Sequence, residues 1–234
     1  MGRKRNPKRA WLWRAAAFLA LAALAGGLWL WWDTQHWTPP ESEYPDQGAL
    51  IAQEDGVVRF ATLKALGANF AYLEASIGAE GMDAAFARNY AAARKAGLQV
   101  GAVHLFDPCA MADGQSANFV TTVPRGKDLL PPVIALGRTA SSCETRVPDA
   151  AVHSELMTLI NQIETHAGKP VILKIKPQFE AEYGLARRIE RNLWVNRTRF
   201  APTYAGRPWL LWSANENLMS EASDEPVEWV VVQP

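Results

Sequence analysis

Leu130-Pro131-Pro132-Val133-Ile134-Ala135-Leu136-Gly137 is a short apolar run that begins at two prolines and ends at a glycine. Such a run, bounded by turn-forming residues, is typical of a buried strand, and we expect one over residues 132–136. Further strands are expected at 68–73, 99–106, 170–175, 193–195, 209–212 and 227–232. Helices are expected between several of these runs, at 82–96, 148–167 and 179–193. Strands that alternate with helices predict an α/β fold with a mainly parallel sheet.

Several segments resemble one known family in the order in which they occur. Residues 69–78, Asn-Phe-Ala-Tyr-Leu-Glu-Ala-Ser-Ile-Gly, are similar to Asp-Phe-Ala-Tyr-Ile-Lys-Ala-Thr-Glu-Gly, and residues 101–106 are close to Gly-Ala-Tyr-His-Phe-Phe. Residues 130–137 resemble a strand written Pro-Val-Leu-Asp-Leu-Glu. The remaining matches lie at 48–60, 169–172, 193–195 and 208–213. The chain therefore resembles glycoside hydrolase family 25, the lysozyme-like muramidases. The resemblance implies an incomplete TIM-like (β/α)5(β)3 barrel over residues 45–234.

The resemblance also implies that the catalytic acids of the family are missing. Four acidic positions line one end of the family's barrel, and they fall on Leu50, Ala135, Gly137 and Glu228. Ile77 also replaces the Glu of the second strand. A glycosidase needs one acid to protonate the leaving oxygen and a second carboxylate to stabilise the cationic centre. We therefore expect no fully equipped catalytic centre, and Glu228 is the one carboxylate retained among these positions.

Another carboxylate could take over a catalytic role. By the period-two alternation of a strand, Glu74 shares a face with Tyr72 and Ser76, and we expect it to point into the barrel. Burial there would raise its pKa and let it act as an acid. The alternative is that Glu74 pairs with Lys174 or Lys176, or lies at the rim in water.

Four further side chains are candidates for ligand binding. His104 is retained from the family's Tyr-His-Phe strand, and Tyr72, Trp194 and Trp212 offer aromatic faces of the kind on which sugars stack. The alternative for each is structural, because large aromatic residues on strands usually belong to the core, and a lone strand histidine is more often a hydrogen-bonded structural residue.

The first residues of the chain predict a membrane anchor. Residues 1–14 hold six basic residues and no acid, which is typical of a cytoplasmic leader. Residues 15–32 carry no charge and span roughly 27 Å as a helix at about 1.5 Å per residue, enough to cross a thin bilayer core. Tryptophans flank this run on both sides, as in an aromatic belt. They are Trp11, Trp13, Trp29, Trp31 and Trp32.

This pattern predicts a single-pass protein of a bacterial inner membrane, with residues 33–44 as a linker and the C-terminal domain periplasmic or otherwise extracytoplasmic. The alternative is a cleaved signal peptide, because Ala23-Leu24-Ala25 before Gly26 could suit a signal peptidase. The apolar run continues beyond that point, which favours the anchor.

The chain has two cysteines, Cys109 and Cys143, and in an exported domain such a pair is more often bonded than free. The resemblance places each of them in a loop at the same end of the barrel, so we expect a disulfide, with two free thiols as the alternative.

Two cysteines and four histidines without ligand-like spacing predict no metal site, and we expect no cofactor.

Charge separates the classes of partner. Because the leader holds six of the 24 basic residues, residues 33–234 carry 18 basic against 24 acidic residues, which is a poor match to nucleic acid. The expected partner is peptidoglycan or an envelope protein. The first hypothesis is an inactive muramidase-like protein that binds one of these. The alternatives are an active hydrolase that uses Glu74 or Glu228 with Glu54 or Asp55, and a structural envelope protein with no glycan ligand.

Overall fold

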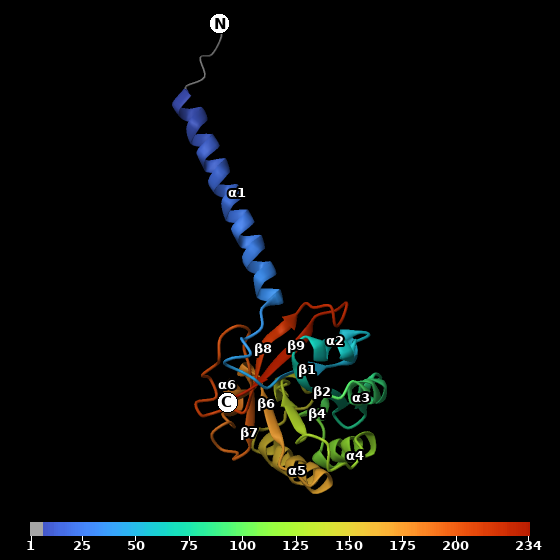
Figure 1. The fold of residues 1–234 in the computed structure, drawn as a ribbon. Coiled ribbons are helices and arrows are strands. Elements are labelled where there is room, and N and C mark those ends of the chain that lie inside the picture. Colours follow the sequence, from blue (N-terminus) through green and yellow to red (C-terminus); the bar gives the residue numbers. More distant parts are fainter. Residues whose placement is uncertain (1–6) are drawn as a thin grey trace. The chain divides into compact units, whose positions relative to one another are not determined.

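The computed structural model describes residues 7–234, with side chains from Trp11 onward, and divides the chain into two compact units, Met1–Trp37 and Thr38–Pro234. The first unit is helix α1 (Pro7–His36), drawn as one continuous helix in Figure 1. Within it, Trp11–His36 has a mean hydropathy of 1.7 and is long and apolar enough to cross a membrane. The expected leader residues Arg3, Lys4 and Arg5 lie outside the described residues.

The second unit is a barrel of eight strands. Neighbouring strands pair in parallel around the barrel from β1 to β8. The last strand, β9, closes the barrel by pairing antiparallel with both β8 and β1. These strands are β1 (Gln47–Ile51), β2 (Ala68–Ile77), β4 (Gln99–Leu105), β5 (Val133–Leu136), β6 (Ile172–Ile175), β7 (Asn192–Asn196), β8 (Leu211–Leu218) and β9 (Val227–Val232). A short strand, β3 (Gly81–Met82), forms a hairpin with β2.

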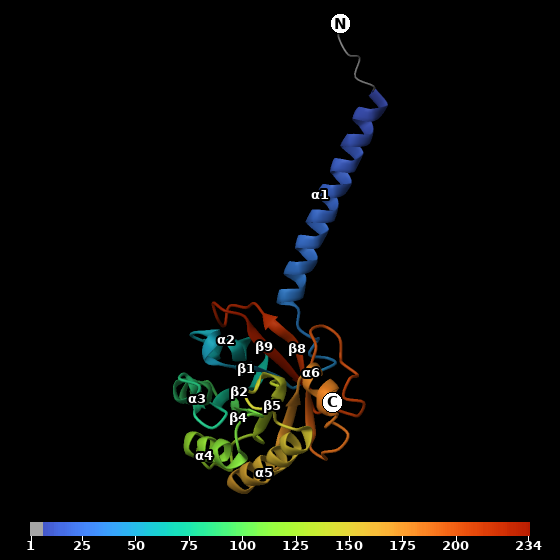
Figure 2. The same cartoon turned by 180° about the vertical axis from the view of Figure 1, so that it is seen from behind.

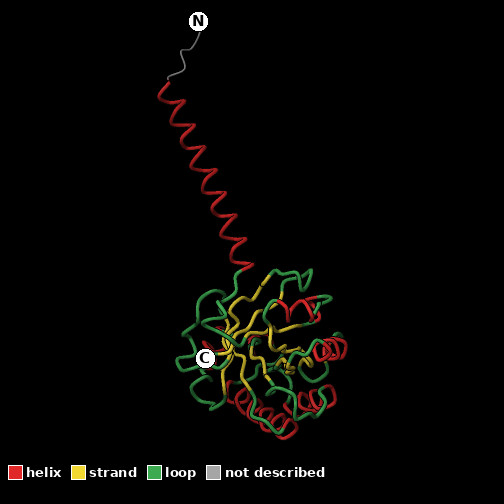
Figure 3. Tube along the Cα trace, in the orientation of Figure 1, coloured by secondary structure: helices red, strands yellow, loops and turns green. Residues whose placement is uncertain are grey.

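Helices follow the first five barrel strands and lie on the outside of the barrel (Figures 2 and 3). They are α2 (Phe60–Ala65), α3 (Phe86–Lys95), α4 (Ala112–Thr122), α5 (Asp149–Ala167) and α6 (Pro177–Tyr183). Single 3-10 turns occur at Gln53–Asp55 and Ala140–Ser142. Five strand-helix units followed by three strands confirm the predicted α/β barrel, and the short strand β3 adds a ninth strand to the sheet that was not predicted.

Two helices differ from the sequence prediction. The expected helix over 179–193 is wrong beyond Tyr183, because Gly184 adopts a left-handed conformation with φ 58° and ends α6 there. The expected helix over 82–96 begins only at Phe86, because Met82 belongs to the hairpin strand and the Asp83 carboxylate accepts a hydrogen bond from the Ala85 amide. Helices α2 and α4 were not predicted.

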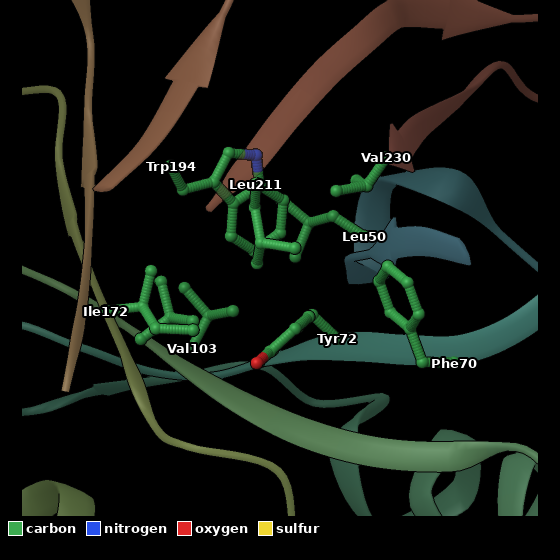
Figure 4. Close-up of a cluster of buried hydrophobic side chains, with 9 residues drawn as sticks. Leu50, Phe70, Tyr72, Val103, Ile172, Trp194, Leu211 and Val230 are labelled. Carbon is green, nitrogen blue, oxygen red and sulfur yellow. The ribbon is translucent and has the colours of Figure 1, made fainter. Parts of the chain in front are cut away.

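The inside of the barrel is filled by apolar side chains from every part of its circumference (Figure 4). Leu50, at the position of the family's first-strand acid, is 5% exposed and belongs to this cluster. An apolar residue there adds to the burial that stabilises the barrel instead of presenting a charge at its mouth. The buried members of the cluster are Leu50, Phe70, Tyr72, Val103, Val133, Ile172, Trp194, Leu211 and Val230.

A register shift in β2 decides which of its side chains face inward. Glu74 pairs with Val103, which faces the barrel interior, but the next paired residue is Ser76, opposite His104. Partners on parallel strands share a face, so the irregularity turns Ser76 to the outside with His104. The expectation that Ser76 shares a face with Glu74 is therefore wrong. The same shift returns Ile77 to the groove side.

The segment before β1 is attached to the barrel. The Gln47 side-chain amide donates to the carbonyl oxygens of Pro39 (3.1 Å) and Tyr44 (2.8 Å), and the Tyr44 ring packs edge-on against Trp212. The expected linker over 33–44 thus overlaps the end of α1 and a segment that is held on the barrel surface.

The disulfide Cys109–Cys143 is confirmed, with a Cα–Cα distance of 5.4 Å. It joins the loop after β4 to the loop after β5, and the same two loops are also joined by Arg138 and Asp107, 3.1 Å apart. Both loops leave the carboxyl ends of their strands, as the resemblance implies.

Replacing both cysteines by serine is expected to destabilise the barrel by about 3–4 kcal/mol, because the bond closes a loop of 34 residues and removes entropy from the unfolded chain. Urea unfolding of the Cys109→Ser/Cys143→Ser variant measures the loss, with reduced wild-type protein as the control. Equal midpoints for the oxidised and reduced wild type would contradict this expectation.

Candidate functional site

A groove of about 730 Å³ opens at the carboxyl ends of β2, β4, β5 and β6. This is the end at which barrel enzymes place their catalytic groups. Ile77, Ala135 and Gly137, three of the degenerate family positions, line it together. A second hollow of about 400 Å³ lies towards β1, β8 and β9, and Glu74 and Glu228 line both.

Two lysines lie on the groove floor beside Ala135 and Gly137, the positions at which the resemblance implies that acids are missing. Lys174 on β6 is the register partner of Ala135 on β5. A Cβ atom added to Gly137 would lie 3.3 Å from Cδ of Lys176, so the Lys176 side chain extends over the position of the second acid. The strand that resembles a two-carboxylate strand therefore lies beside two lysine side chains.

Glu228, the retained carboxylate, is engaged in a buried ion pair. Lys174 Nζ lies 2.7 Å from Glu228, and the two side chains are 6% and 16% exposed. The Ser213 hydroxyl also donates to Glu228, and the Asn196 amide lies 3.5 Å away. Lys174 Nζ lies 4.9 Å from the centroid of the Trp194 ring. The sequence alternative that Lys174 pairs with Glu74 is not the pairing observed.

Glu74 is the carboxyl best suited to donate a proton. Burial raises its pKa from 4.5 to about 7, the nearby Lys174 charge lowers it, and Glu54, Asp83 and Glu228 raise it. A group with this pKa holds a proton for about half of the time at neutral pH. The expectation that Glu74 faces the groove and is partly desolvated agrees with this placement.

Replacing Glu74 by glutamine is expected to change the pH dependence of stability. Because the folded pKa lies above the unfolded value, the folded state binds the extra proton, and wild-type stability falls as pH rises from about 4.5 to about 7. Glu74→Gln should be more stable than wild type by about 3 kcal/mol at pH 8, and the difference should vanish near pH 4. Thermal unfolding across this range measures it, and a constant difference would contradict the assignment.

Asp55 has a structural task at the edge of the second hollow. Its carboxylate accepts a hydrogen bond from the Ala52 amide at 2.8 Å. Burial raises its pKa to about 6, the Ala52 hydrogen bond opposes this, and nearby acids add to it. Asp83 likewise accepts from the Gln53 amide at 2.7 Å. These contacts fix the turn that follows β1, where Glu54 lines the hollow.

His104 lies on the other face of its strand, under α4. It is fully buried, its Nδ1 is 2.8 Å from the Ser76 hydroxyl, and its Nε2 is 3.2 Å from the Gln115 side-chain oxygen. Burial lowers its pKa to about 4, so the ring is neutral at physiological pH. The structure therefore places His104 in a hydrogen-bonded structural site and not on the groove wall.

The three aromatic candidates are also packed inside the barrel unit. The Tyr72 hydroxyl donates to the Pro131 carbonyl oxygen at 3.2 Å, at the end of the barrel opposite the groove. Trp194 donates to the Ser213 hydroxyl, and Trp212 donates to the Arg197 carbonyl oxygen. Each ring is at most 3% exposed, which leaves no open face for a sugar.

Lys174 and Lys176 were expected only as alternative partners of Glu74, and their position on the groove floor was not predicted. The sequence signal for this position is the spacing of the two lysines in Ile172-Leu173-Lys174-Ile175-Lys176. They lie two residues apart, at the end of an otherwise apolar strand. Such lysines face one side of the sheet together.

Comparison with known proteins decides the family. The model of glycosyl hydrolases family 25 matches residues 51–218. The chain belongs to glycosyl hydrolases family 25. Among solved structures, a family 25 glycosyl hydrolase from Bacillus anthracis is similar with a TM-score of 0.76 and 24% identity, over 86% of this chain and 93% of that one.

Two further family 25 folds are similar. A bacterial lysozyme from Streptomyces coelicolor has a TM-score of 0.70 and 19% identity, over 81% of this chain and 92% of that one. A family 25 lysozyme from Aspergillus fumigatus has a TM-score of 0.65 and 16% identity, over 81% and 94%. At these identities the likeness establishes the fold. No curated protein matches the sequence.

Proposed function

We propose that this family 25 protein is a membrane-anchored pseudoenzyme whose groove binds peptidoglycan without hydrolysing it. The observation that carries the proposal is the groove floor, where Ala135 and Gly137 stand at the positions of the family's acid pair and Lys174 and Lys176 face them. The family supplies the expected ligand class, since the similar structures include proteins named as lysozymes.

Hydrolysis needs a proton donor beside the leaving oxygen and a second carboxylate. Loss of the donor alone removes about 10² to 10⁴ in rate. Glu228 cannot serve freely as the second carboxylate, because Lys174 and the Ser213 hydroxyl already occupy its oxygens. The groove nevertheless has a volume of about 730 Å³. Charged side chains such as Asp107, Arg138 and Lys176 line it and offer hydrogen-bonding groups to a polar polymer.

Helix α1 supports the membrane assignment. Its span Trp11–His36 has no buried residues, and an exposed helix that is mainly apolar is more stable in lipid than in water. Retained as an anchor, it places the barrel on the outer side of a bacterial inner membrane, because the basic leader stays in the cytoplasm. A signal sequence would pass the same test of length and composition. The mass of the mature protein in membranes separates the two.

A second candidate function is an active hydrolase with Glu74 as the acid. The raised pKa of Glu74, about 7, favours it, since a general acid works best with a pKa near the working pH. Among the positions that the resemblance sets against the family's acids, only Glu228 is a carboxylate, and it is paired with Lys174. This is why the binding function is preferred.

Binding is tested by co-sedimentation of the full-length protein in detergent with purified sacculi. Wild-type protein is expected to sediment with sacculi, and Lys176→Trp, which places a bulky ring on the groove floor, is expected to reduce the bound fraction at least about tenfold. The matched control is Lys95→Trp, an exposed lysine at the end of α3 outside the groove. No sedimentation at any salt concentration would contradict glycan binding and favour a protein partner in the envelope.

A further inference from the structure

The end of the barrel opposite the groove carries a group of cations, here called the basal patch, of which five are exposed and Lys169 is half-buried. Its members lie in the last turns of helices or in the connections that lead back to the next strand, and such connections meet at the amino ends of parallel strands. The basal patch consists of Lys64, Arg94, Lys95, Arg125, Lys127 and Lys169.

Few acids compensate the basal patch. Residues 60–69, 93–99, 123–132 and 168–171 contain one acid, Asp128, which pairs with Arg94 at 2.5 Å. Lys64 donates to the Gly97 carbonyl oxygen at 3.1 Å, and Lys169 donates to the carbonyl of Lys127 at 2.9 Å. The two contacts to carbonyl oxygens do not neutralise Lys64 or Lys169, because a carbonyl group carries no net charge.

The second hollow at the groove end has the opposite charge. It is lined by six carboxylates and by no basic residue. They are Glu54, Asp55, Glu74, Glu216, Glu225 and Glu228. The groove beside it holds both signs, with Arg138, Lys174 and Lys176 among its lining residues. An anionic surface would therefore be attracted by the basal patch and repelled by the second hollow.

An apolar hollow of about 230 Å³ opens at the basal end. Phe70, Leu130, Pro131 and Leu210 are among the residues that line it. It lies beside the basal patch, because Leu130 continues the connection that holds Lys127. A surface of this kind, apolar with a cationic margin, matches the interface between lipid headgroups and acyl chains.

The chain from α1 joins the barrel at the same end. Strand β1 begins there with Gln47, whose side chain holds Pro39 and Tyr44, and Asn69 donates to the Pro45 carbonyl oxygen at 3.4 Å. This segment carries its own acids, Glu41, Glu43 and Asp46, and Asp46 lines the apolar hollow and accepts a hydrogen bond from the Asn69 amide at 3.4 Å. The six cations of the basal patch outnumber these three acids and Asp128.

From these observations we propose that the basal patch binds anionic phospholipid headgroups of the bilayer that α1 crosses. The proposal rests on the anchor role of α1 proposed above. Each lysine or arginine close to an anionic surface strengthens binding about fivefold, and the attraction is confined to about 10 Å at 0.1 M salt. Docking of this end leaves the groove, at the other end of the barrel, open to the cell wall.

The test is hydrogen exchange of the full-length protein in nanodiscs of phosphatidylcholine, with and without 30% phosphatidylglycerol. Amides of residues 94–99 and 125–131 are expected to exchange more slowly in the anionic discs, while residues 219–226 at the groove end exchange equally in both. The protection should disappear at 0.5 M salt, because screening shortens the range of the attraction.

Charge reversal makes the test specific. Lys95→Glu/Lys127→Glu should reduce the equilibrium constant for docking at least about 25-fold. Arg146→Glu/Arg197→Glu, with the same change of charge in the loops after β5 and β7, should leave it unchanged. Equal exchange in both lipids, or protection that survives Lys95→Glu/Lys127→Glu, would overturn the proposal. A chain that fails to enter discs would instead contradict the anchor, and failure to bind sacculi would contradict only the groove function.

Discussion

Restoring the two missing carboxylates, by Ala135→Asp together with Gly137→Glu, is expected to produce release of reducing ends from sacculi at least about a hundredfold above wild type. The general acid of a glycosidase contributes about 10² to 10⁴ in rate, and the double change returns both groups to the strand that resembles the family's acid pair. The positions can accept them. Ala135 and Gly137 both line the groove, and the atom nearest to a new Cβ at Gly137 belongs to the flexible Lys176 side chain.

The matched control is Ala135→Asn/Gly137→Gln, which adds nearly the same volume without an acid and should remain inactive. Wild-type-like thermal unfolding and sacculus binding of both variants would show that the groove is intact. If the restored variant binds sacculi and still releases nothing, the view that only the acids were lost is contradicted. Lys174 and Lys176 would then be the next residues to replace, since they face the restored pair.

Removing Lys174 is expected to cause the largest loss of stability among single changes at the groove. Lys174→Met leaves the Glu228 carboxylate largely buried with hydroxyl and amide donors but without a counter-charge. Loss of one partner from a buried ion pair costs about 3–5 kcal/mol. Urea unfolding at pH 7 should therefore show a fall of about 3 kcal/mol in the free energy of unfolding.

Lys174→Met/Glu228→Gln is the corresponding control. It removes the charge from both partners and keeps an acceptor for Ser213, so most of the stability should return. If Lys174→Met alone unfolds within 0.5 kcal/mol of wild type, the ion pair is not an important part of the groove floor.

The barrel could be predicted because its strands coincide with short apolar segments of the sequence. Several of these segments also resemble segments of the family and follow one another in the same order along the chain. Helix α6 shows where this reasoning stops. Residues 179–193 are compatible with a helix by composition, but Gly184 ends the helix through a backbone conformation that a pattern of apolar residues does not report. Helix α4 was missed because its apolar face is small, with Phe119 as its one large buried side chain.

The absence of acids at Leu50, Ile77, Ala135 and Gly137 is a prediction that follows from the residue identities together with the resemblance to the family. The placement of the ligand-binding candidates could not be predicted in this way. One register irregularity in β2 puts Ser76 opposite His104 on the outer face, and strict alternation along the strand does not predict such a shift. The partner of Glu228 is equally non-local, because Lys174 reaches it from a strand 54 residues away.

The central claim is that a family 25 barrel has been kept while its hydrolytic chemistry has been lost. The most direct measurement is release of reducing ends from purified sacculi by the full-length wild-type protein, compared with buffer and with an active family 25 lysozyme. The account predicts no release above buffer at any pH between 5 and 8. Robust turnover that is abolished by Glu74→Gln would contradict it and establish Glu74 as a displaced catalytic acid.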